Sequence, residues 1–128
     1  SGYVWLAIAG ATIAAAGLEP GTPAYDAALH ALFLGFVFAM VFGHAAIIFP
    51  AVLRVKVPYA PVFYLPLALL HASVALRLAG DATGSTDVLR SGGIANGVAL
   101  AAFIVTMVVA VVRGRASKPP SVRAGPRG

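Results

Sequence analysis

Long apolar stretches with very few charged residues dominate this chain and most constrain its fold. Four of them cover, approximately, residues 3–18, 25–53, 61–79 and 88–112. Hydrophobic residues make up 60% of the chain and charged residues only 10%, whereas a soluble domain has about 25% charged residues. A helix of about 20 apolar residues crosses a bilayer. We therefore expect residues 1–112 to form an all-α, integral membrane four-helix bundle in contact with lipid.

Short polar segments, expected to form turns and loops, separate the apolar stretches. A Glu-Pro-Gly-Thr-Pro turn at residues 19–23 follows the first stretch, and residues 54–60 connect the second to the third. Gly80 and Asp81 are expected to end the third helix. Residues 113–128 are rich in Pro, Gly, Arg, Lys and Ser, which predicts a basic, disordered tail.

Charge placement predicts an orientation. Arg54 and Lys56 lie in the second loop, on the side that four spans would share with the basic tail, and the opposite loops and helix ends hold the acidic residues Glu19, Asp26, Asp81 and Asp87. Because cytoplasmic segments of membrane proteins are enriched in Lys and Arg, both termini are expected in the cytoplasm. The protein would thus be a multi-pass protein of the cell (inner) membrane. The net charge of +5 describes mainly the tail, so we expect no nucleic-acid partner.

Three histidines, His30, His44 and His71, lie inside the apolar stretches. Histidine within a membrane span usually faces the bundle interior, pairs with a polar group, carries protons or binds a metal. The chain has no cysteine, so histidine is its obvious soft ligand. A uniform α-helix would place His30 and His44 about 40° apart around the helix and about 21 Å apart along it, on one face at different depths.

We expect His44 and His71 to lie at similar depths on neighbouring helices. Measured from the inner ends of their antiparallel helices, His44 lies about 12 Å deep and His71 about 15 Å deep. Two level imidazoles on neighbouring helices can hold one haem iron from both sides, which predicts haem b bound through His44 and His71. Arg77 would bind a haem propionate or form an interfacial ion pair with Asp81. The alternative for each histidine is a hydrogen bond to a neighbouring helix.

Small residues recur every four positions on two of the predicted helices. Gly35, Ala39 and Gly43 do so on the second helix, and Gly93, Gly97 and Ala101 on the fourth. Such a flat ridge lets another helix or a flat cofactor approach closely. Asn96, beside the second ridge, is expected to form a hydrogen bond with a neighbouring helix.

The stretch from His30 to Pro50 reads HALFLGFVFAMVFGHAAIIFP and resembles the His-x4-Gly-Phe…Gly…Pro helix of NnrS-type membrane proteins. That family contains haem and copper and is linked to nitric oxide metabolism. The stretch is also similar to the helix that supplies a low-spin haem ligand in haem-copper oxidases and nitric oxide reductases. The resemblance implies that His30 is a haem or metal ligand, that Gly35 gives room and that Pro50 ends the helix.

The resemblance covers about a quarter of the chain, and the departures from it bear on the cofactor. Those families have close to twelve spans rather than four. Ala28 and Ala31 stand where the NnrS pattern has His and Glu, which counts against copper. The fourteen-residue spacing of His30 and His44 also resembles that of dihaem b-type cytochromes, whose second ligand pair is incomplete here. A homodimer or a partner subunit would supply the missing ligand.

The leading hypothesis is thus a small cytochrome b-like membrane protein for electron transfer or for handling a diatomic gas, nitric oxide or oxygen. His44 and His71 would bind the iron, and His30 would be a further ligand or a proton or propionate contact. The alternative is a cofactor-free accessory subunit of a larger membrane complex, and a weaker one is a small transporter with a histidine proton relay. No catalytic motif such as H-E-x-x-H or a phosphate-binding glycine loop is visible, and the redox partner is not indicated.

Overall fold

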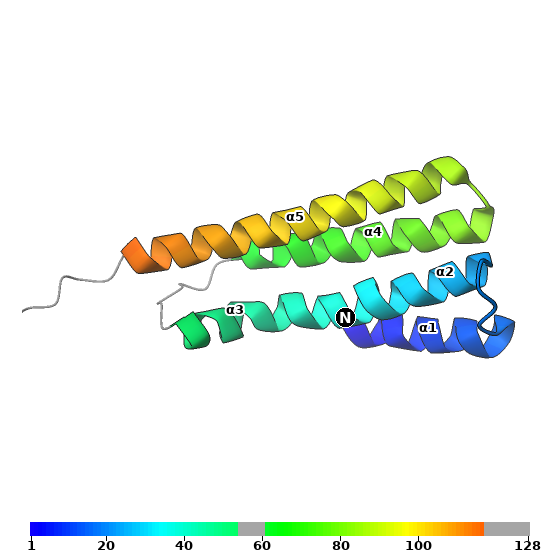
Figure 1. The fold of residues 1–128 in the computed structure, drawn as a ribbon, viewed down its shortest axis with the longest axis horizontal. Helices are drawn as coiled ribbons and strands as arrows, with labels where there is room; N and C mark the ends of the chain where they lie inside the picture. Colours follow the sequence, from blue (N-terminus) through cyan, green and yellow to red (C-terminus); the bar gives the residue numbers. More distant parts are fainter. Residues whose placement is uncertain (54–60, 117–128) are drawn as a thin grey trace, which may run out of the picture.

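A computed structural model describes residues 1–53 and 61–116, and these residues form helices with no β-strand among them. The all-α prediction is confirmed. Figure 1 shows two layers of antiparallel helices. In one layer α1 (Gly2–Ala16) packs against the first half of a long second helical segment, and in the other α4 (Tyr64–Thr83) packs along α5 (Thr86–Ala116).

Three of the described helices are long and apolar enough to cross a membrane: Pro23–Ala45, Pro61–Thr83 and Thr86–Ala116. The first predicted span is shorter in the structure. It corresponds to α1, which has 15 residues and a length of roughly 22 Å, less than the hydrocarbon thickness of a bilayer.

The second helical segment is continuous but not uniform. It consists of α2 (Pro23–His30), the π-helix η1 (Ala31–Phe38) and α3 (Ala39–Leu53). Thr22 caps its start, because its side-chain oxygen accepts a hydrogen bond from the Tyr25 backbone N–H. The expectation that Pro50 ends this helix is wrong, since the backbone stays helical to Leu53.

The third helix ends later than predicted. A 3₁₀ turn, η2 (Pro61–Phe63), leads into α4, which continues through Gly80 and Asp81 to Thr83. Gly80 serves packing instead, because a Cβ at this position would lie 2.8 Å from the Leu89 backbone nitrogen of α5. The helix ends at Gly84, which adopts the left-handed conformation (φ +65°) that suits glycine.

Two predictions concern segments that lie outside the described residues: the connector at residues 54–60, and residues 117–128 of the basic tail. The first residues of that tail belong to α5, which continues past Val112 to Ala116.

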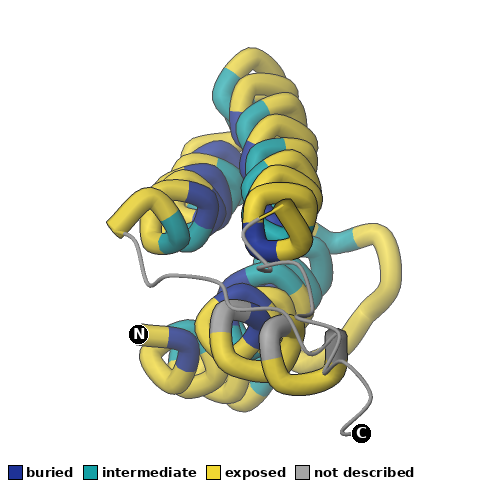
Figure 2. The backbone as a smooth tube through the Cα atoms, turned by 90° about the vertical axis from the view of Figure 1, so that its left-hand side faces the viewer, coloured by how far each residue is buried: buried dark blue, intermediate teal, exposed yellow. Residues whose placement is uncertain are grey.

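The core lies where the two layers meet. Ala39 and Phe42 of α3 pack there against Leu70 of α4 and Ala99 of α5. The Phe42 ring stacks on Phe103 with a centroid distance of 3.9 Å. Figure 2 shows that buried residues follow the facing sides of the helices, while exposed residues cover the outside. The predicted bond from Asn96 is confirmed, since its side-chain oxygen accepts a hydrogen bond from Ser73 of α4.

Candidate functional site

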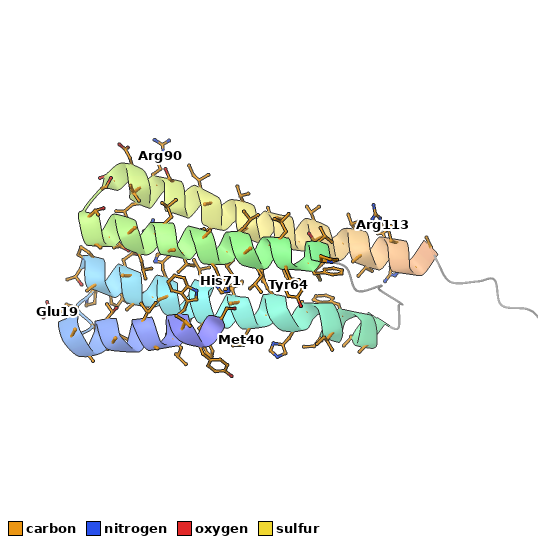
Figure 3. The ribbon with its side chains drawn as sticks, turned by 180° about the vertical axis from the view of Figure 1, so that it is seen from behind. Glu19, Met40, Tyr64, His71, Arg90 and Arg113 are labelled. Carbon is orange, nitrogen blue, oxygen red and sulfur yellow. The ribbon has the colours of Figure 1, made fainter. Side chains whose placement is uncertain are left out.

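His71 projects from α4 between the two layers (Figure 3) and forms hydrogen bonds at both ring nitrogens. Trp5 Nε1 on α1 lies 2.8 Å from His71 Nδ1, and the Ser1 hydroxyl lies 2.9 Å from Nε2. An indole N–H can only donate, so Nδ1 must be the acceptor and the proton of the neutral ring is on Nε2. His71 therefore fixes the start of α1 against α4.

Gly35 allows Trp5 to reach this position. A Cβ on Gly35 would lie 2.6 Å from Trp5 Cβ and 2.9 Å from Trp5 Cδ2, well inside van der Waals contact. Gly35 thus gives room, as the resemblance implied, and the group that occupies the room is the indole of Trp5. Neither Trp5 nor its bond to His71 was predicted, because hydropathy alone does not indicate which helices pair.

His44 shows the opposite hydrogen-bond pattern. Its Nδ1 lies 2.7 Å from the Met40 carbonyl oxygen one turn earlier. A carbonyl only accepts, so Nδ1 carries the proton and Nε2 keeps its lone pair. His44 is exposed on α3, and no second hydrogen bond to it is formed within the described residues. The lone pair on Nε2 of this exposed side chain therefore has no partner within the described residues.

His30 repeats this pattern in a more enclosed setting. Its Nδ1 lies 2.8 Å from the Asp26 carbonyl oxygen, again one turn earlier, and the side chain is half-buried near α4. In metal sites a histidine commonly donates its second ring N–H to a carbonyl or carboxylate, which leaves the other nitrogen free to bind. His30 and His44 both have this arrangement, and His71 does not.

The π-helix changes the relation between His30 and His44. The expected offset of about 40° assumed about 100° per residue throughout, but η1 occupies eight of the residues between them. A π-helix has i→i+5 hydrogen bonds and so turns less per residue. The expected shared face is therefore wrong, and the two side chains differ in exposure as well as in depth.

A cluster of charged side chains lies at the end of the bundle that carries the α1–α2 and α4–α5 loops. Arg77 of α4 donates to Asp26 Oδ2 of α2 through Nε at 3.1 Å and through Nη2 at 2.8 Å. Its Nη1 donates to the Leu89 carbonyl of α5 at 3.2 Å. Asp81 lies beside them, so the sequence placed Arg77 and Asp81 near His30 correctly. The main partner of Arg77 is nevertheless Asp26, not Asp81.

These contacts decide which predicted residues fit haem. His44 and His30 each offer a free Nε2, which is the nitrogen that haem iron needs. His71 has its Nε2 protonated and its Nδ1 accepting from Trp5. The three guanidinium nitrogens of Arg77 already contact protein acceptors, so a propionate would have to displace Asp26. No three His, Asp or Glu side chains of the described ranges come together as a metal site.

Comparison with known proteins adds one finding. A family described as "Domain of unknown function (DUF8744)" matches residues 1–112. No curated protein and no solved structure matches the chain.

Proposed function

The chain belongs to the DUF8744 family, and we propose that it is a haem-binding protein of the cell (inner) membrane. The membrane part of the proposal rests on the three long apolar helices. Charge supports a cytoplasmic location for the end of the bundle where α3 and α5 finish (Figure 1), because Arg54 and Lys56 follow α3 in the sequence and the basic tail follows α5. Glu19 lies at the other end, far from Arg113 (Figure 3).

The observation that carries the haem proposal is the exposed imidazole of His44. Its neighbours on α3 are apolar and exposed, with Ile47 71% and Ile48 52% accessible, so in a bilayer this face meets hydrocarbon. A polar group with an unmatched lone pair is unfavourable there. Binding an iron through Nε2, or a hydrogen bond from a partner, would remove that penalty.

We place the haem at the outer face of α3, not between His44 and His71. This differs from the clamp that helix depth suggested, because the hydrogen bonds of His71 leave no free lone pair on Nε2. The second axial ligand would come from a second copy of the chain or from another membrane subunit. His30 is the next candidate ligand, since its Nδ1 donates in the same way.

The proposed role is electron transfer or the handling of a diatomic gas such as nitric oxide or oxygen. Haem supplies reversible one-electron chemistry and a site for such gases, and its axial ligands set the potential. The resemblance of residues 30–50 to NnrS-type proteins supports the gas-handling form. The redox partner would be another component of the same membrane.

Visible absorption spectra of the purified protein, oxidised and then reduced with dithionite, test this proposal. We expect a Soret band with sharp reduced α and β bands in wild type. His44→Ala should lose the bands, while the matched variant His71→Ala should keep haem with an unchanged α band. A spectrum lost in His71→Ala but kept in His44→Ala would restore the interhelical clamp and reject the site on α3.

The alternative function is a cofactor-free accessory subunit of a larger membrane complex. The same exposed His44 favours it, because a polar group on the partner helix could satisfy Nε2. Gly97 also lies on an open face of α5, where a Cβ would contact nothing within 4 Å. A colourless protein, expressed with excess haem, that copurifies with a stoichiometric membrane partner would favour this alternative.

A further inference from the structure

A groove of about 430 Å³ runs along the seam between α4 and α5, and its volume is within the range of sites that bind small molecules. Leu76 and Ser91 line it toward the α4–α5 loop, and Leu69 and Val98 line it toward the middle of the helices. Leu69 and Leu76 are seven positions apart on α4, so the groove extends about 10 Å along the helix axis. Its long direction therefore follows the helices, as the acyl chains of a surrounding bilayer would.

The groove offers apolar contacts and very few polar ones. The hydroxyl of Ser73 is buried and is used by the Leu70 carbonyl and by Asn96. The other hydroxyl, that of Ser91, donates to the Asp87 carbonyl. An occupant therefore needs no hydrogen-bonding group inside the groove, which suits a hydrocarbon chain. The remaining lining residues are all apolar: Leu69, Ala72, Leu76, Ile94, Ala95 and Val98.

Two charged side chains lie on α5 between the groove and the α4–α5 loop. Arg90 precedes the lining residue Ile94 by four positions, and Asp87 precedes the lining residue Ser91 by four. Residues at this spacing lie on one side of a helix, so both charges are on the side of the groove. Both side chains are exposed, and Figure 3 shows Arg90 on the outside of the bundle. The ion pairs formed within the described residues involve neither of them.

These charges are complementary to a headgroup that carries both signs. A guanidinium binds the oxygens of a phosphate through charge-assisted hydrogen bonds, and a carboxylate pairs with an ammonium. Side chains of a helix are tilted toward its N-terminus, so Arg90 and Asp87 are directed toward the loop, at the level of lipid headgroups. An anionic headgroup would be repelled by Asp87, whereas a neutral headgroup with a phosphate and an amine matches both charges.

We propose that the α4–α5 seam binds one phospholipid with a primary-amine headgroup, of the phosphatidylethanolamine type. Its phosphate contacts Arg90, its ammonium contacts Asp87, and one acyl chain occupies the groove. The proposal rests on the membrane part of the proposed function and not on haem.

The contact between α4 and α5 does not depend on this lipid. At the loop end the two helices approach closely through Gly80 and Gly92, where an added Cβ would lie within 3 Å of the backbone of the opposite helix. Substitutions of exposed residues around the groove should therefore change lipid binding and leave the helices in place.

Native mass spectrometry of the full chain, released from nanodiscs that contain equal amounts of phosphatidylethanolamine and phosphatidylglycerol, tests the groove. We expect wild type to retain one phosphatidylethanolamine. Ala72→Phe places a ring in the groove and should abolish retention. Ala75→Phe, at an exposed residue of α4 that does not line the groove, is the matched control and should retain the lipid. Equal retention in the two variants would overturn the proposal.

The headgroup contacts have their own variants. Arg90→Gln should weaken phosphatidylethanolamine binding at least about tenfold, because it removes a hydrogen-bonded charge, and Arg90→Lys should restore most of the binding. Arg115→Gln, at an exposed cation at the other end of α5, is the control. Asp87→Asn should remove the preference for phosphatidylethanolamine over phosphatidylglycerol. Unchanged binding in Arg90→Gln, or a preference of wild type for phosphatidylglycerol, contradicts the assignment.

The outcome for the lipid is separate from the outcome for the membrane location. If the protein requires detergent for extraction but retains no phospholipid, the lipid site is excluded and the membrane location stands. If the protein is extracted without detergent, both are excluded.

Discussion

Trp5 Nε1 donates a hydrogen bond of 2.8 Å to His71 Nδ1 and thereby joins the first helix to α4. The indole and imidazole rings also stack, with a centroid distance of 6.3 Å and an interplanar angle of 22°. This contact fixes the tautomer of His71, because an indole N–H cannot accept a proton. It explains why His71, which helix depth predicted to pair with His44, is bound to α1 instead.

The Trp5–His71 contact should be visible in fluorescence, since Trp5 is the only tryptophan of the chain. His71→Ala removes both the hydrogen bond and the stacked ring, so the emission of Trp5 should change in wavelength and intensity. Stability should fall by about 0.5–1.5 kcal/mol, the usual net value of such a bond. Arg90→Leu, at an exposed residue of α5, is the control, and an equal emission change there would contradict the contact.

Gly35→Ala should loosen α1. The added Cβ would overlap the Trp5 side chain, and overpacking of this kind typically destabilises by about 1–3 kcal/mol. Thermal unfolding in detergent, followed by Trp5 emission, measures the effect. Gly43→Ala is a matched change on the same helical segment, where a Cβ meets nothing within 4 Å, and its unfolding temperature should not fall.

Gly92 and Gly97 should respond in opposite directions to substitution by alanine. A Cβ on Gly92 would lie 2.9 Å from the Arg77 backbone nitrogen, so Gly92→Ala should separate α4 from α5 and destabilise by about 1–3 kcal/mol. Gly97→Ala should be neutral or stabilise by up to about 1 kcal/mol, because alanine is the better helix former. The two unfolding temperatures provide the comparison, and equal losses would argue against the close α4–α5 approach.

Arg77→Leu should destabilise the loop end of the bundle. It removes the two hydrogen bonds to Asp26 and leaves that carboxylate without its cation. A hydrogen bond to a charged group contributes about 1.5–3 kcal/mol. Hydrogen exchange of α2 and the end of α4 should accelerate. Arg90→Leu changes an exposed cation on α5 and should leave exchange there unchanged; similar acceleration in both variants would contradict the role of Arg77.

Hydropathy and spacing along the sequence determined the helical fold and the approximate extent of each helix. These properties depend on residues close in sequence: apolar length, turn residues and local capping. The prediction that the third helix ends at Gly80 failed for a reason that is not local in the sequence. Gly80 packs against the backbone of α5 at Leu89. The sequence alone does not distinguish a glycine that allows close helix packing from one that ends a helix.

The tertiary structure alone decided the partners of the polar groups. The pairing of apolar helix surfaces has little hydrophobic driving force in lipid. Hydropathy therefore does not predict which helices contact each other. The sequence placed His30, Arg77 and Asp81 at one depth, but only the packing of α2 against α4 made Asp26 the partner of Arg77. Likewise, the π-helix at Ala31–Phe38 altered the relative direction of His30 and His44. The angle between two side chains on a helix is the sum of the rotations of all residues between them, and the hydropathy of the individual residues does not indicate those rotations.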